Sequence, residues 1–315
     1  MDLVLYTGLR DAALLPYLFT SLRLFMPCYG LLHAFVPVEE VALVQPLVSG
    51  LIADPSRLRL HQEMYPAWLA KLPWPWRIFY SPFYLDVLVE REGRSSEQSQ
   101  YFMFLDSDVV LAYPLACKSL FDEDTGKPMT FYWPHIIWGA REGIDVLFNA
   151  STNSGYIGSF MTYFPQVYHR SIFLKIRQRV RRAFPAARSY EKAYAQWARH
   201  VGSVDMFSVL GHTAFYDAHD TMTFVSCGWR PRRGADSDSG TRAVPAEAEC
   251  ESVARPGIHV PYAWHSCVET PGPVCNPTFE KFLPRPDGGV GRPAERFVHT
   301  ALEILSSGSC FAHFH

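Results

Sequence analysis

The strongest constraint on the fold of this chain is the apolar run Tyr101–Leu105, which ends in two acids, Asp106 and Asp108. Five consecutive apolar residues have the length of a strand. A strand that is apolar on both faces is typical of the centre of a sheet covered by helices on each side. Strand geometry directs residues i and i+2 to the same face, so both carboxylates can reach one point. We therefore expect a central strand whose carboxyl end carries a polar site.

The remaining hydrophobic pattern predicts strands that alternate with helices in the first third of the chain and a more mixed order after it. Alternation of this kind favours a parallel α/β sheet. Strands are expected at residues 3–6, 31–36, 76–80, 101–105, 129–133, 156–163 and 257–264, and helices at 16–25, 41–51, 82–89, 172–180 and 293–305.

The pair Asp106 and Asp108 indicates a metal site. Carboxylate oxygens are the ligands that Mg²⁺ and Mn²⁺ prefer, and these ions commonly bridge to substrate phosphates. In open α/β sheets, ligands bind outside the carboxyl ends of the strands. A second triplet, Asp236-Ser237-Asp238, has no apolar run before it, so we interpret it as a coincidence.

Composition excludes several functional classes. With 29 Lys and Arg against 31 Asp and Glu, the formal net charge is −2, so the chain lacks the basic excess of a nucleic-acid-binding protein. The aromatic content of 15% excludes a disordered chain. No apolar run approaches the roughly 18 residues of a membrane span, and no signal peptide is recognisable. The sequence as given predicts a cytoplasmic protein, or a Golgi or secretory one if an anchor was removed.

Three further patterns leave alternatives open. None of the seven cysteines forms a C-x-x-C pair, which favours free thiols over local disulfides. A basic stretch favours a solvated helix face, with an anionic acceptor or a peripheral membrane surface as the alternative. Its members are Arg170, Lys175, Arg177, Arg179, Arg181 and Arg182. The aromatic residues between 65 and 84 favour core packing, with stacking on a sugar ring as the alternative.

The apolar strand ending in Asp-x-Asp, about 100 residues after an opening strand, resembles the nucleotide-sugar-dependent glycosyltransferases of the GT-A fold. The run 3–7 followed by Arg10 resembles the family's first strand and uridine-binding loop. The segment 153–157 resembles the stretch that lines the donor or acceptor pocket. The segment Tyr262–His265 resembles the late stretch whose histidine completes metal coordination.

The resemblance implies a single compact domain with a Rossmann-like mixed sheet flanked by helices. Residues 1–125 would bind the nucleotide sugar and residues 126–315 the acceptor, with a mobile loop near 230–256. Mn²⁺ or Mg²⁺ would be held by Asp106, Asp108 and His265. The nucleoside diphosphate sugar, such as a UDP-sugar, would contact Tyr6, Thr7, Arg10, Ser107 and Asn153.

The implied reaction is attack by a hydroxyl of a glycan, a protein or a small molecule on the anomeric carbon of the donor. An inverting enzyme needs a carboxylate base near that hydroxyl, and Asp205 is the candidate, with Asp217 and Asp220 as substitutes. A retaining enzyme needs no such base, and both outcomes stay open. The structural alternative for Asp205 is a helix N-cap.

The site residues also have other interpretations. Asp106 and Asp108 could cap a helix or a turn, Arg10 could be a solvated loop charge, and Asn153 and His265 could be ordinary structural residues. The enzyme alternative is a haloacid-dehalogenase-type phosphatase, with Asp106 as nucleophile and Asp108 as general acid. The position of the motif argues against it, because that family carries the motif on its opening strand. A non-catalytic module that binds sugar nucleotides or glycans is the remaining alternative.

Overall fold

The computed structural model describes residues 1–63, 66–72, 74–93, 99–107, 109, 111, 115–132, 141–148, 156–160, 165–202 and 204–226. The chain divides into two units, one of residues 1–229 and 249–264, the other of residues 230–248 and 265–315. All described residues belong to the first unit. The expected loop near 230–256, strand at 257–264 and helix at 293–305 lie outside them, and the expected division at residue 125 stays a prediction.

The central element of this unit is a five-stranded sheet of order β3-β2-β1-β4-β6. β1, β2, β3 and β4 run parallel, and β6 pairs with β4 in the antiparallel direction. The predicted mixed, mostly parallel sheet is therefore confirmed. The strands are β1 Asp2–Tyr6, β2 Leu32–Val36, β3 Leu58–Gln62, β4 Tyr101–Asp106 and β6 Gln166–His169, with β5 Met129–Tyr132 and β7 Thr223–Ser226 paired in a separate small sheet.

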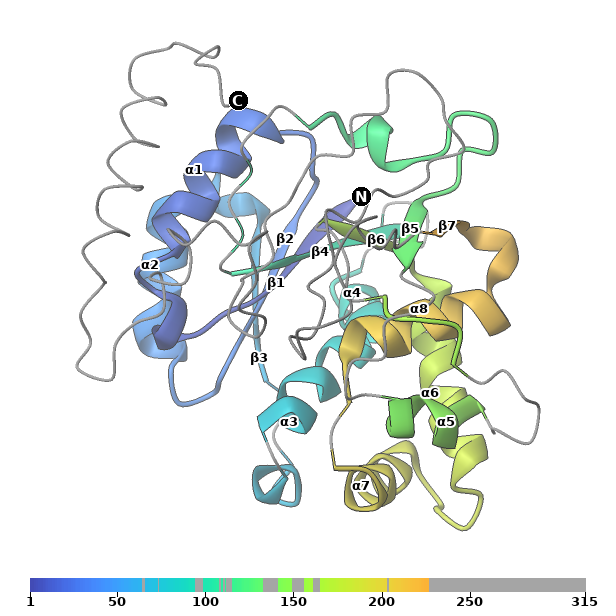
Figure 1. Ribbon diagram of the computed structural model, residues 1–315. Coiled ribbons are helices and arrows are strands. Elements are labelled where there is room, and N and C mark those ends of the chain that lie inside the picture. The colour runs from blue at the N-terminus through green and yellow to red at the C-terminus, as the bar shows by residue number, and fades with distance from the viewer. Residues whose placement is uncertain are drawn as a thin grey trace, which may run out of the picture. The chain divides into compact units, whose positions relative to one another are not determined.

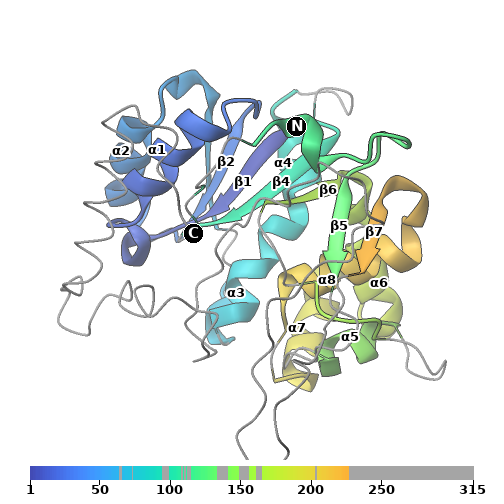
Figure 2. The ribbon, with the colours of Figure 1, turned by 45° about the horizontal axis from the view of Figure 1, so that its top comes forward.

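Helices cover both faces of the sheet, with α1 and α2 on one side and α4, α6 and α8 on the other (Figures 1 and 2). The helices are α1 Leu15–Phe25, α2 Val41–Leu51, α3 Trp74–Tyr80, α4 Leu85–Arg91, α5 Arg141–Phe148, α6 Ser171–Ala183, α7 Tyr190–His200 and α8 Met206–Asp217. Short 3₁₀ turns are η1 Leu9–Asp11, η2 Pro55–Arg57, η3 Leu69–Lys71, η4 Pro82–Tyr84, η5 Cys117–Leu120 and η6 His219–Thr221.

The core forms where the predicted central strand meets the helices. Residues 102–105 of β4 are each at most 3% exposed. Phe104 lies 6.2 Å from Phe207 of α8, and Phe102 lies 5.5 Å from Phe173 of α6, between ring centroids. Complete burial stabilises each large apolar side chain by about 1.5–3 kcal/mol. The contacts of Phe102 and Phe104 with α6 and α8 fix the face of β4 that these side chains occupy, and Asp106, two residues further along the strand, lies on the same face.

The predicted strand at 76–80 is wrong, because this segment is helix α3. Trp76 and Tyr80 are four residues apart, so a helix places both on one face, where each meets Tyr194 of α7 at ring-centroid distances of 5.6 and 5.1 Å. Both rings are buried, which confirms core packing for them. The third parallel strand is instead β3, whose alternating apolar and polar residues gave no continuous apolar run.

The predicted strand at 156–163 is also wrong in its described part. Residues 156–160 form no regular strand, and the strand of this region is β6, which begins at Gln166. β6 pairs with β4 in register, with Phe104 opposite Gln166 and Phe102 opposite Tyr168. The antiparallel edge of the sheet therefore starts ten residues later than expected.

The basic helix α6 is not a solvated charged face. Arg177 makes two hydrogen bonds of 2.6 and 2.8 Å to the carboxylate of Asp86, and both side chains are buried. Arg170 lies 2.8 Å from a carboxylate oxygen of Glu90. Arg179 and Lys175 both bond to Asp217, the former through its carboxylate and the latter through its carbonyl oxygen. Only Arg181 and Arg182 of the six cations are exposed, so the charge run serves mainly to join helices.

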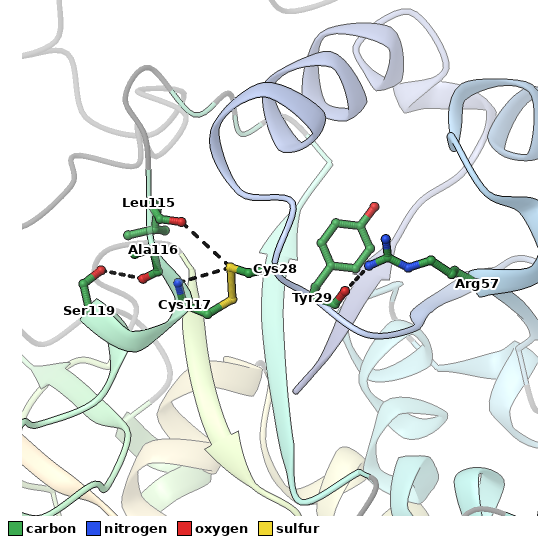
Figure 3. The surroundings of a disulfide bond; sticks show 7 residues. All are labelled: Cys28, Tyr29, Arg57, Leu115, Ala116, Cys117 and Ser119. Carbon is green, nitrogen blue, oxygen red and sulfur yellow. Dashed lines mark hydrogen bonds between the residues drawn. A yellow bond between two sulfur atoms is a disulfide. The ribbon is translucent and has the colours of Figure 1, made fainter.

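A disulfide joins Cys28, which follows α1, to Cys117 in the turn after β4 (Figure 3). The expectation of free thiols is therefore wrong for this pair, and the other five cysteines lie outside the described residues. The Leu115 N–H also donates to the Phe25 carbonyl at 2.7 Å. Together these links tie the segment after β4 to α1. Over the described part of the chain, no helix is both long enough and apolar enough to cross a bilayer.

Candidate active site at the carboxyl edge of the sheet

The strand order creates a topological switch point between β1 and β4. From β1 the chain builds outward through β2 and β3 on one side, whereas β4 and β6 lie on the other. Connections that leave in opposite directions open a crevice at the carboxyl ends of the two strands, where ligands bind in open α/β sheets. Tyr6 and Asp106 are register partners, so both strands end at the same level. Figure 2 shows β1 and β4 side by side at the centre of the sheet.

Asp106 is the last residue of β4 and is half-buried at this crevice. Because Asp106 and Tyr6 are paired in register, their side chains share a face of the sheet. Ser107 follows in a turn that the Val109 N–H closes onto the Asp106 carbonyl at 3.3 Å. The structure thus brings Asp106, Ser107 and Tyr6 together. Asp108 lies outside the described residues, and its predicted role stays a prediction.

The loop after β1 is held against the loop after β2. The Thr7 N–H donates to the Phe35 carbonyl at 3.0 Å, and the Leu9 N–H donates to a carboxylate oxygen of Glu40 at 2.6 Å. A Cβ at Gly8 would lie 2.5 Å from that same oxygen, so glycine permits this close approach. Thr7 is fully buried, and its hydroxyl makes no hydrogen bond to any described residue. Its predicted contact with the donor stays a prediction.

Arg10 lies in η1, at the outer end of the same loop. Its side chain is 74% exposed, and its Nε is 3.6 Å from a carboxylate oxygen of Asp11. Exposed pairs of this kind contribute little stability, so the guanidinium can reorient at small cost. This geometry fits the interpretation of Arg10 as a solvated loop charge. The predicted contact of Arg10 with the donor stays a prediction.

Glu63 is a site residue that the sequence patterns did not indicate. It follows β3 directly, accepts a hydrogen bond from the Tyr6 hydroxyl, and is 4% exposed. Its second carboxylate oxygen makes no hydrogen bond to any described residue. Burial raises its pKa to about 7, against the opposing effect of the nearby Arg77 guanidinium. The sequence signal for Glu63 is an acid directly after a strand, and this signal can be used only if β3 is predicted first.

Asp205 is the N-cap of α8, where its two carboxylate oxygens accept the N–H groups of Phe207 and Ser208 at 3.1 and 2.9 Å. The N-cap interpretation is therefore confirmed, and the role of Asp205 as a base stays a prediction. Among the substitutes, Asp217 forms an ion pair with Arg179, and Asp220 is exposed in η6.

His212 of α8 anchors the described end of the segment that contains Asn153. The imidazole Nδ1 lies 2.7 Å from the Ser208 carbonyl, which makes Nδ1 the protonated nitrogen, and Nε2 accepts the Ile157 N–H at 3.2 Å. Burial lowers the pKa of His212 to about 4, so the ring is neutral at neutral pH. Asn153 and His265 themselves lie outside the described residues.

The described groups at the crevice have the chemistry of a polar ligand site. Asp106 supplies a hard carboxylate oxygen, the donor type that suits Mn²⁺ or Mg²⁺. Tyr6, Thr7 and Glu63 supply hydroxyl and carboxyl groups at the neighbouring strand ends. A complete metal site requires further ligands, and the sequence offers Asp108 for that purpose, two residues after Asp106.

Comparison with known proteins adds little to this description. No family model matches the chain, and no curated protein matches it. Among solved structures, an active-site mutant of LgtC aligns with 15% identity and a TM-score of 0.41, covering 71% of this chain and 72% of that one. The galactosyltransferase LgtC in complex with donor and acceptor sugar analogues aligns with 14% identity and a TM-score of 0.38, covering 71% and 73%. Likeness at this level assigns neither a family nor an activity.

Proposed function

We propose that this chain is a metal-dependent glycosyltransferase that moves a sugar from a nucleoside diphosphate sugar to an acceptor hydroxyl. One observation carries the proposal. The Asp-x-Asp motif begins at the carboxyl end of β4, beside the end of β1, at the switch point of the sheet. This is the place where an open α/β sheet binds ligands.

The residues of the crevice have distinct roles in this proposal. Asp106 and Asp108 hold a divalent ion, which when bound neutralises charge on the leaving diphosphate. Thr7 and Arg10 contact the nucleoside diphosphate from the loop after β1. The contact of Glu40 with the Leu9 N–H ties the loop after β1 to the loop after β2, so the donor would meet a preorganised loop.

Glu63 adds a group whose charge changes near neutral pH. With a pKa of about 7, its carboxyl is partly protonated in neutral solution and can then donate a hydrogen bond. Loss of that proton places a negative charge beside Tyr6, on the edge that would face the anionic diphosphate. We therefore expect donor binding to weaken above neutral pH.

The test is release of the nucleoside diphosphate from a panel of UDP-sugars with and without Mn²⁺. The variants Asp106→Asn and Asp108→Asn are compared with Asp236→Asn and Asp238→Asn, which remove the same charges from the second Asp-Ser-Asp triplet. We expect Mn²⁺-dependent release in the wild type and in the controls, and its loss in the first two variants. Equal release in all four variants would refute the proposal.

The same preparation distinguishes the two other functions. Hydrolysis of a phosphomonoester that Asp106→Asn abolishes, without turnover of any UDP-sugar, identifies a phosphatase. Binding of UDP-sugars without turnover in the presence of candidate glycan, protein and small-molecule acceptors identifies a binding module.

A further inference from the structure

A second polar cluster lies on the same face of the sheet, away from the crevice. His33 of β2 and His61 of β3 face each other, with Nδ1 of the first 2.9 Å from Nε2 of the second. A carboxylate oxygen of Glu92, the residue after α4, lies 3.9 Å from the same Nε2 of His61. The three side chains together offer one ligand atom each within 4.8 Å of one another.

A carboxylate orients the imidazole of His33 through the ring nitrogen that does not face His61. Its Nε2 lies 3.4 Å from Asp2, which itself accepts the Ser99 hydroxyl at 2.8 Å and the Leu31 N–H at 2.9 Å. Burial opposes ionisation of Asp2, but the hydrogen bonds from His33, Leu31 and Ser99 prevail and bring its pKa to about 2. A charged Asp2 keeps the proton of His33 on Nε2 and leaves Nδ1 with a lone pair. Carboxylates hold metal-ligating histidines in this way.

We propose that His33 Nδ1, His61 Nε2 and a Glu92 carboxylate oxygen bind one divalent ion of the Zn²⁺ type. Two imidazoles and one carboxylate are ligands of this ion, and a water molecule completes the four positions. Tetrahedral coordination with Zn–N bonds of about 2.0–2.1 Å separates two nitrogens by about 3.3 Å. The existing 2.9 Å between the rings therefore needs only a small widening.

The ion would replace the hydrogen bond between the two rings. For Nε2 of His61 to coordinate, the single proton of this neutral imidazole must lie on Nδ1, so no proton has to leave the ring. Glu92 and Asp2 carry two negative charges toward the ion, and Arg59, 3.5 Å from Glu92, offsets one of them.

The cluster is separate from the crevice. His61 pairs in register with Phe35, Phe35 with Tyr6, and Tyr6 with Asp106, so three strand spacings separate His61 from Asp106. At about 4.8 Å for each spacing, this is about 14 Å. The side chain of Glu92 is 27% exposed, whereas His33 is fully buried, so the ion would enter from the Glu92 side. Its role would be to join β2 and β3 to the end of α4.

The experiment is titration of the metal-free full chain with Zn²⁺ by calorimetry and with Co²⁺ by visible absorption. In the double variant Asp106→Asn with Asp108→Asn, which lacks the ion site of the proposed function, we expect one equivalent to bind, with a tetrahedral Co²⁺ spectrum that lacks the near-ultraviolet band of thiolate ligands. Glu92→Gln changes a partly exposed group and should fold normally, yet weaken Zn²⁺ binding at least tenfold. Asp2→Asn should weaken it by about 10- to 100-fold. His200→Ala, on the exposed end of α7, is the matched control and should leave the affinity unchanged.

The double variant Asp106→Asn with Asp108→Asn separates this proposal from the proposed function. It should lose turnover of the sugar nucleotide and keep the Zn²⁺ affinity. Absence of Zn²⁺ and Co²⁺ binding, a thiolate spectrum, or an affinity that Glu92→Gln and His61→Ala leave unchanged would each overturn the proposal. In those cases the two histidines form only a hydrogen bond.

Discussion

The raised pKa of Glu63 predicts a pH-dependent cost to stability that one conservative substitution removes. A carboxyl with a pKa of 4.5 when unfolded and about 7 when folded stabilises the fold fully below pH 4.5. That stabilisation is lost as the pH rises through 7, because the unfolded chain then loses its proton more readily. At about 1.36 kcal/mol for each unit of pKa, the loss between pH 5 and pH 8 is about 2.5 kcal/mol.

The assay is urea unfolding of the wild type and of Glu63→Gln at pH 5, 6, 7 and 8. Glutamine keeps an oxygen that can accept the Tyr6 hydroxyl but carries no charge. Other groups titrate in this range, so the measured quantity is the difference in unfolding free energy between the two proteins. We expect this difference to move in favour of the variant by about 2.5 kcal/mol from pH 5 to pH 8. A difference that stays constant over this range would refute the buried, proton-binding Glu63.

Three further substitutions test the packing by urea unfolding. Asp86→Ala leaves its buried arginine partner unpaired and should cost about 3–5 kcal/mol, whereas Asp145→Ala on the surface of α5 should cost about 0.5 kcal/mol or less. Asp205→Ala removes the cap of α8 and should cost about 1–2 kcal/mol, with Asp205→Asn nearly neutral. Gly211→Ala places a Cβ 2.0 Å from the Phe160 ring and should cost about 1–3 kcal/mol. Equal costs within either pair, or a neutral Gly211→Ala, would contradict the corresponding contact.

Much of the sheet could be predicted from local patterns. β1, β2 and β4 are apolar apart from Asp2, His33 and Asp106, because helices cover both their faces, and β4 ends at the acid where the apolar run ends. The predicted helix from Pro16 to Phe25 corresponds to α1. The apolar pattern of each of these segments indicates which residues are buried, so each element can be predicted from its own sequence.

The elements that were missed depend on partners far away in the chain. α3 is as apolar as a strand, and only its contacts with α7, more than 110 residues later, show why a helix is favoured. β3 contains Arg59 and His61, whose polar groups are satisfied by Glu92 and His33. The arginines of α6 look solvated until Asp86, 91 residues earlier, is placed beside Arg177. Local propensity contains none of this information.

The residues of the candidate site also fall into those that local sequence patterns indicate and those that they do not. Asp106 and Tyr6 were found from the motif and from the opening strand, and the register of the sheet brings them together. Glu63 was missed because β3 was missed. Asp205 was found as an acid before a helix, and the structure shows its capping bonds. A capping acid and a catalytic base have the same sequence pattern, so the sequence cannot separate them.

Calorimetric titration of the chain with UDP, with and without Mn²⁺, tests whether the crevice between β1 and β4 binds a nucleoside diphosphate through an ion held by the Asp-x-Asp motif. We expect UDP binding that requires Mn²⁺ and is lost in Asp106→Asn, with uridine alone binding weakly in either case. UDP binding of equal strength without the ion, or unchanged by Asp106→Asn, would contradict it.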